Sequence, residues 1–118
     1  MFPRYRKYNS KKTRCNNGHL HVSKKEAVRC NELFLMLKNG NISKLKVQNR
    51  MKLKESFRFQ GKAIRGISYI ADFTYFDKDE KVYVVEDVKG YRTDVYKLKI
   101  KLLLFIMREK DDFKFIET

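Results

Sequence analysis

The stretch AIRGISYIADFTYFDKDEKVYVVEDVKG, residues 63–90, contains two apolar segments separated by a charged loop. Both segments are rich in the aromatic and β-branched residues that favour strands, so they predict a β-hairpin. If the loop is centred on Asp79-Glu80, antiparallel pairing places Asp72 directly opposite Asp87. The candidate site depends on this pairing.

Side chains alternate between the two faces of a strand. Asp87 and Lys89 are therefore expected on one face, and Glu86 on the other, where we expect it to form an ion pair. Two carboxylates directly across a ladder repel each other, and a bound divalent cation removes the conflict. We expect Asp72 and Asp87 to hold a divalent cation such as Mg²⁺, with Lys89 orienting water or stabilising charge on a phosphate. A solvated hairpin with ordinary surface charges is the alternative, and a one-residue slip in register would separate the acids.

The remainder of the chain predicts two helices and further strands around this hairpin. Turn and capping signals indicate a short hairpin at residues 13–22, a helix at 23–37 and a second helix from 93 or 94 to about 107. Alternating apolar residues indicate a strand at 42–53 with a basic outer face, and a last strand is expected at 113–116. Gln60-Gly61 is expected to form a turn before the strand that begins at residue 63. This order predicts an α/β fold in which a mixed, mostly antiparallel sheet is flanked by two helices. We expect a basic N-terminal arm at residues 1–12 and a single domain at residues 13–118.

A third carboxylate is expected from the first helix. Glu26 falls in line with Cys30, Leu33 and Leu37 on the stripe that faces the core, whereas Glu32 lies well off that stripe and is expected to face solvent. Glu26 is therefore the candidate. Its alternative role is purely structural, since it also completes a capping box with the serine three residues earlier.

The charge of the chain favours a polyanionic partner. Its 28 Lys and Arg residues against 14 Asp and Glu residues give a formal net charge of +14, and the first 25 residues contain no acid. Aromatic rings interleaved with this basic arm could stack on unpaired bases, although a solubilising tail would have a similar composition. The residues expected to contact nucleic acid are Arg4, Arg6, Lys7, Lys11, Lys12, Lys24, Lys25, Lys97 and Lys101.

The second helix is expected to have a basic stripe and an opposite, buried apolar stripe. The basic stripe comprises Lys97, Lys101 and Arg108, for which a solvated face is an equal alternative to phosphate contacts. The buried stripe comprises Leu98, Leu102, Phe105 and Ile106. No apolar run reaches membrane-spanning length and no export signal is evident, so an intracellular protein is expected.

Two cysteines and two histidines offer a set of zinc-type ligands. Cys15, His19, His21 and Cys30 lack a CxxC or HxxxH unit, and the two histidines alternate as on one face of a strand. Zinc is therefore a minor alternative. A reducing compartment would keep both cysteines as thiols.

The acid on one strand followed by acid-x-lysine on the next resembles the signature of the PD-(D/E)XK nuclease superfamily. The match consists of Asp72 and Asp87-Val88-Lys89, with Glu26 in the position of the preceding helical acid; Ala71 stands where the superfamily has proline. Residues 23–27, 69–73 and 85–90, with Tyr96-Lys97 after them, also resemble a small phage and prophage family of nuclease-like proteins.

This resemblance implies a restriction-endonuclease-like core, Mg²⁺ or Mn²⁺ dependence, and DNA cleavage in phage replication, recombination or packaging. It implies Glu26, Asp72, Asp87 and Lys89 as catalytic residues, and Glu26, Asp72, Asp87 and the Val88 carbonyl as metal ligands. The implied location is the cytoplasm of a bacterial or phage-infected host cell.

Two functions from different classes follow. The first is a metal-dependent endodeoxyribonuclease, for which branched DNA such as a Holliday junction and a homodimeric assembly fit the small, basic chain, with no small-molecule cofactor. The second is a non-catalytic DNA- or RNA-binding protein with the same fold. Intact acids and lysine favour the first, because a binder gains nothing from acids where phosphate must approach.

Overall fold

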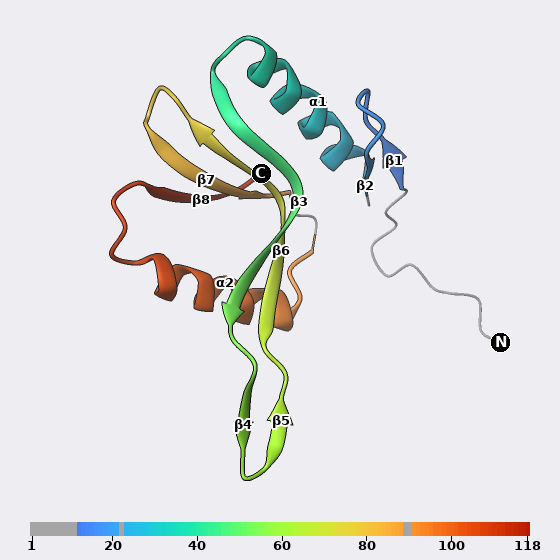
Figure 1. Ribbon diagram of the computed structural model, residues 1–118. Helices are drawn as coiled ribbons and strands as arrows, with labels where there is room; N and C mark the ends of the chain where they lie inside the picture. Colours follow the sequence, from blue (N-terminus) through green and yellow to red (C-terminus); the bar gives the residue numbers. More distant parts are fainter. Residues whose placement is uncertain (1–11, 22, 89–90) are drawn as a thin grey trace, which may run out of the picture.

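The computed structural model describes residues 12–21, 23–88 and 91–118, and its centre is a four-stranded sheet (Figure 1). The strand order is β3-β6-β7-β8, formed by β3 (Ile42–Lys54), β6 (Ile67–Asp77), β7 (Val82–Asp87) and β8 (Phe113–Glu117). Neighbours are antiparallel except β7 and β8, which are parallel. The predicted α/β fold with a mixed, mostly antiparallel sheet and two helices is confirmed. The predicted arm falls almost entirely on residues outside those described.

Two helices and two small hairpins complete the fold. They are α1 (Lys24–Lys38), α2 (Asp94–Met107), the ribbon of β1 (Thr13–Arg14) with β2 (Leu20–His21), and the ribbon of β4 (Phe57–Phe59) with β5 (Lys62–Ile64). The predicted caps are confirmed, since the hydroxyls of Ser23 and Thr93 each accept a backbone N–H of the first helical turn. Within the described residues, neither helix is long and apolar enough to cross a membrane.

The core has two parts, one beneath each helix. Ala27, Cys30 and Leu33 of α1 pack with Phe73 and Tyr75 of β6, among others. Ile100 and Leu103 of α2 pack with Tyr69, Ala71 and Val85. The strands of the central sheet therefore supply apolar side chains to both helices, as expected of a sheet covered on two sides.

The apolar stripe predicted for α2 is wrong. The residues of α2 that pack against the sheet are Tyr96, Ile100, Leu103 and Met107, whereas Leu98 and Phe105 are 58% and 61% exposed and Ile106 is also exposed. Leu102 is half-buried. Apolar residues occur nearly all round this helix, so its sequence fits more than one phase.

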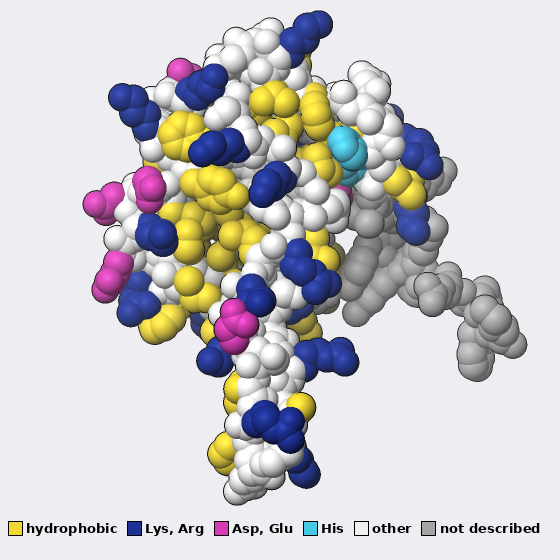
Figure 2. Space-filling model, in the orientation of Figure 1, with side chains coloured by type: hydrophobic (Ala, Val, Ile, Leu, Met, Phe, Trp, Pro, Cys, Tyr) yellow, Lys and Arg dark blue, Asp and Glu magenta, His cyan; other side chains and the backbone are white. Residues whose placement is uncertain are grey.

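The β4–β5 hairpin extends beyond the helices from the ends of β3 and β6 (Figure 1). Gln60 and Gly61 both have positive φ, 50° and 77°, as a tight two-residue hairpin turn requires. The predicted turn at these two residues is confirmed. The hairpin carries basic side chains away from the body of the protein, as Figure 2 shows.

Candidate functional site

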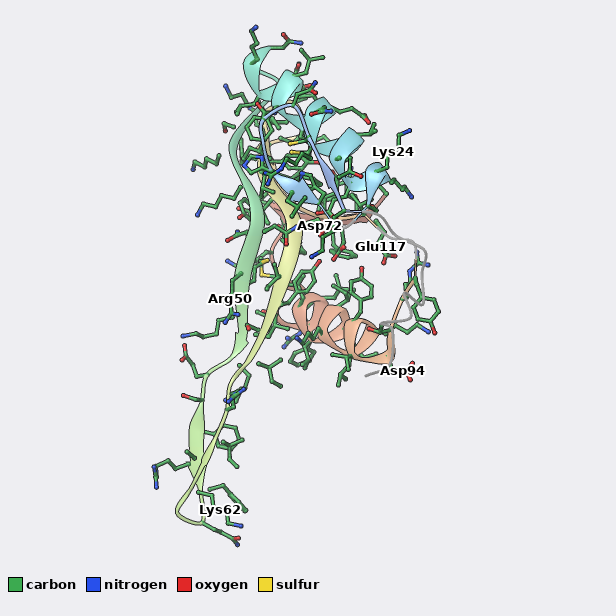
Figure 3. All side chains as sticks on the ribbon, turned by 90° about the vertical axis from the view of Figure 1, so that its right-hand side faces the viewer. Lys24, Arg50, Lys62, Asp72, Asp94 and Glu117 are labelled. Carbon is green, nitrogen blue, oxygen red and sulfur yellow. The ribbon has the colours of Figure 1, made fainter. Side chains whose placement is uncertain are left out.

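The register between β6 and β7 is the one predicted. Phe73 pairs with Glu86 and Asp77 with Val82, so that the next position along the ladder places Asp72 opposite Asp87. Figure 3 shows Asp72 in the space between the two helices. The hairpin loop therefore brings together two acids that are 15 residues apart in the sequence.

Each of the two carboxylates accepts a hydrogen bond from a neighbouring group. One oxygen of Asp72 accepts the backbone N–H of Val88 at 2.8 Å. Asp87 is 2% exposed and accepts the phenolic O–H of Tyr69. These contacts fix the carboxylates on their strands and aim them at each other.

The surroundings of Asp72 disfavour its charged form. Burial, followed by the hydrogen bond and the charge of Asp87 and the charge of Glu26, raises the pKa of Asp72 to about 8 against a smaller opposing effect of the Val88 N–H. Asp72 therefore holds a proton at neutral pH in the metal-free protein.

Two tyrosines border the pair. Burial, and then the hydrogen bond to Asp87, raise the pKa of Tyr69, so its hydroxyl stays protonated and acts as a donor. The ring of Tyr96 lies 6.4 Å from that of Tyr69, and its hydroxyl donates to Glu117 at 2.6 Å. Tyr96 thereby ties the start of α2 to β8 beside the acids.

The acid pair opens into a pocket of about 270 Å³ between β6 and the start of α2. Its lining includes Asp72, Asp87, Tyr69, Tyr96, Thr93 and Lys99. Lys99 was not among the residues predicted from the sequence, because the assumed phase of α2 favoured Lys97 and Lys101. The spacing of Tyr96, Lys99 and Ile100 on one side of the helix is the signal that could have identified it.

Glu26 lies on the core side of α1, as predicted, and is 1% exposed. Its Oε1 accepts from His21 Nδ1 and from Gln48 Nε2, both at 2.8 Å. Its charge contributes to the raised pKa of Asp72, which places it in the same electrostatic neighbourhood. Glu32 is exposed, as predicted, and forms an ion pair with Arg29 at 3.3 Å.

Gln48 occupies an unusual backbone position next to the site. Its φ is 55°, and it lies in β3 between Val47 and Asn49, which pair with the residues flanking Asp72. A positive φ at a residue other than glycine is sterically costly and often accompanies a functional site. Here it directs the amide of Gln48 to the carboxylate of Glu26.

The expected ion pair of Glu86 is confirmed. Glu86 is fully buried and accepts from Arg29 Nε at 2.5 Å and Nη2 at 3.0 Å, from the Tyr75 hydroxyl at 2.7 Å, and from Thr118 Oγ1 at 3.1 Å. The hydrogen bond to Glu86 raises the pKa of Arg29 above its usual range. This acid is engaged with α1 on the opposite face from Asp87.

The predicted basic residues are only partly described. Arg4, Arg6, Lys7, Lys11 and Lys89 lie outside the described residues. Lys12, Lys24, Lys25, Lys97 and Lys101 are exposed. The predicted basic outer face of β3 is confirmed: its exposed cations are Lys44, Lys46, Arg50, Lys52 and Lys54, and the last three also line a pocket of about 420 Å³ with Arg65 (Figure 2).

The cysteine and histidine residues lie closer together than their sequence spacing suggested. One ligand atom from each of Cys15, His19, His21 and Cys30 lies within 4.8 Å of the others. The β1–β2 hairpin contributes the first three and α1 the fourth. We call these four residues the Cys/His cluster.

These observations define an α/β protein in which neighbouring strands of a central sheet present a buried aspartate, Asp87, and a half-buried one, Asp72, to a small pocket. The chain belongs to the family described as Protein of unknown function (DUF1064), whose model matches residues 5–115. Comparison with the curated proteins and with the solved structures gave no match.

Proposed function

We propose that this protein is a metal-dependent endonuclease that hydrolyses phosphodiester bonds of DNA. The observation that carries the proposal is the pairing of Asp72 with Asp87 across the β6–β7 ladder, open to a pocket, in a chain of net charge +14. Buried like charges are costly unless a cation accompanies them. The surrounding positive charge would bring a polyanion to that cation.

The donor set fits the Mg²⁺ or Mn²⁺ that the superfamily resemblance implies. Carboxylate oxygens are the ligands that these hard ions prefer. Asp72 and Asp87 would hold it, with Glu26 and the Val88 carbonyl as the further predicted ligands. Such an ion polarises a phosphate and lowers the pKa of a bound water.

The residues of the chain would divide the remaining tasks. Tyr69 holds Asp87 in place through its hydroxyl, and the Val88 N–H does the same for Asp72. Lys99 lines the pocket and is placed to contact a phosphate. Lys89 is proposed to orient the attacking water or to stabilise charge on the phosphate in the transition state.

Binding of the DNA backbone is proposed for the exposed cations. Those of β3 form a row on one face of the strand, and they continue toward the β4–β5 hairpin. Lysine and arginine contacts to phosphates neutralise charge and release counterions, so affinity should fall steeply with salt. An intracellular location, and a homodimer that cuts paired strands, remain part of this proposal.

The test incubates the full chain with single-stranded, duplex, flap and four-way-junction DNA in the presence of Mg²⁺, Mn²⁺ or chelator. We expect cleavage that requires the metal and that is lost in Asp87→Ala and Lys89→Ala, while Asp79→Ala in the exposed loop cuts normally. Cleavage in chelator, or full activity in both variants, would refute the mechanism. DNA binding by the wild type without cleavage of any substrate would instead support the non-catalytic binding protein.

A further inference from the structure

The Cys/His cluster has the ligand types and the spacing of a tetrahedral metal site. His19 Nδ1 lies 3.6 Å from Cys15 Sγ and 3.7 Å from Cys30 Sγ. Zinc–sulfur bonds of about 2.3 Å and zinc–nitrogen bonds of about 2.0–2.1 Å in a tetrahedron place sulfur and nitrogen about 3.6 Å apart. The observed separations match that value closely.

The environment of His21 is an independent indication that its ring binds a metal. Its side chain is fully buried, and its Nε2 makes no hydrogen bond of ordinary geometry to the described residues. A buried nitrogen left in this state costs free energy that a bound metal would recover. The other ring nitrogen, Nδ1, is held by Glu26 at 2.8 Å, which orients Nε2 as carboxylates commonly orient metal-binding histidines.

The rings of both histidines are also fixed by apolar neighbours. His19 stacks on Phe34 with ring centroids 5.4 Å apart, and His21 packs against Phe73 at 5.9 Å. Preoriented ligands of this kind lose little freedom when a metal binds.

The local fold would benefit from a cross-link. Each strand of the β1–β2 hairpin has two residues, and a two-stranded ribbon is marginally stable at best by itself. The four ligands join this hairpin to the second turn of α1, where Cys30 lies. A structural metal would anchor the hairpin to the helix.

We propose that Cys15, His19, His21 and Cys30 bind a structural Zn²⁺. Two thiolates and two imidazoles favour zinc over Mg²⁺ or Mn²⁺, which separates this site from the aspartate pair. On binding, the two thiols release their protons to solvent. The two sulfurs lie 3.1 Å apart, beyond the bonded distance of about 2.05 Å for a disulfide, and would move apart to about 3.8 Å around the metal.

The test measures the metal content of the 118-residue chain after expression in cells grown with zinc and purification without chelator. Elemental analysis should find about one Zn²⁺ per chain. His19→Ala, which changes a half-buried side chain, and Cys30→Ser should each lose most of it. Asp87→Asn is the matched control and should keep its zinc, because it removes an acid of the other site.

A second measurement covers the case in which a variant does not fold. Co²⁺ added to the chelator-treated, reduced wild type should give the intense visible bands of a tetrahedral site and a thiolate-to-cobalt charge-transfer band. Wild type free of zinc and without these bands would overturn the proposal. So would a native protein whose mass shows a Cys15–Cys30 disulfide, or a folded His19→Ala variant with undiminished zinc content.

Discussion

Glu86 and Asp87 are adjacent in β7 and both are buried, at 0% and 2% exposure, yet their carboxylates have different partners. On the α1 side, Glu86 meets the guanidinium of Arg29 in a two-point ion pair. On the α2 side, Asp87 meets the phenol of Tyr69 and a second carboxylate, Asp72. Arg29 neutralises Glu86, whereas the pKa of Asp72, beside Asp87, is raised.

That difference assigns opposite roles to neighbouring residues. A buried carboxylate with an arginine partner contributes to the folded structure, and removing its partner is costly. Two carboxylates held together against their repulsion lower the stability of the metal-free protein, which is typical of a functional site. Five experiments can break or sharpen this comparison.

The largest effect is expected on catalysis. Asp72→Asn should reduce the proposed Mn²⁺-dependent DNA cleavage by roughly a thousandfold, because one of the two carboxylates proposed to bind the metal is lost. Initial cleavage rates on the preferred DNA substrate give the measurement. Asp79→Asn in the exposed hairpin loop should retain the wild-type rate, and a loss of less than about tenfold in Asp72→Asn would place the chemistry elsewhere.

The next effect is expected on stability, at the other acid. Arg29→Ala should lower the free energy of unfolding by about 3 kcal/mol, because it leaves the buried charge of Glu86 without its partner. Urea denaturation measures this change. Lys24→Ala, at an exposed position of the same helix, should change stability by less than about 0.5 kcal/mol. Equal effects of the two substitutions would show that the ion pair contributes nothing particular.

A pH effect should distinguish the aspartate pair in the metal-free protein. The pKa of Asp72 is about 8 in the folded state against 3.8 for the ordinary group, so the folded protein binds the extra proton between these values. Stability therefore falls as pH rises through that window, by the linkage between proton binding and folding. Asp72→Asn should flatten this slope in thermal melts recorded from pH 5 to pH 9.

The same proton should oppose the metal. Stabilisation of the wild type by Mn²⁺ is expected to be greater at about pH 8 than at about pH 6, because metal binding must displace the proton held by Asp72. Thermal shifts at fixed Mn²⁺ concentration measure it. A stabilisation that does not depend on pH would show that Mn²⁺ binds at a place other than Asp72 and Asp87.

The smallest effect is expected at Tyr69. Tyr69→Phe removes the hydroxyl that donates to Asp87 while keeping the ring in the core beneath α2. Stability should change by about 1 kcal/mol or less, and cleavage should fall by about tenfold or less. A loss as large as that of Asp72→Asn would mean that the hydroxyl acts in the chemistry rather than in positioning Asp87.

Much of the fold could be predicted because its signals are local. The serine and threonine caps, the Gln60-Gly61 turn and the charged loop before β7 all act through their immediate neighbours. The loop then fixes the register of β6 against β7, and alternation along a strand places Glu86 and Asp87 on opposite faces. The position of Asp72 opposite Asp87 follows from these local rules.

Two features could not be predicted because they depend on contacts between distant segments. The phase of α2 is ambiguous in a helix with apolar residues nearly all round, and packing against Tyr69, Ala71 and Val85 selects it. The Cys/His cluster has no local ligand motif, since one ligand comes from a helix and three from a hairpin. The four side chains come together only after the β1–β2 hairpin packs against α1.

The sequence by itself determined the elements, the pairing of the two aspartates and the separation of Glu86 from them, because hydrogen-bonded turns and strand alternation are short-range. Only the tertiary structure decided which lysine of α2 lines the pocket, where Glu26 directs its carboxylate, and that four sulfur and nitrogen ligands meet beside α1. Those outcomes depend on how whole elements pack against one another. The hydrophobic effect is non-directional, so local sequence allows several packings, and the one that buries the most apolar surface is selected.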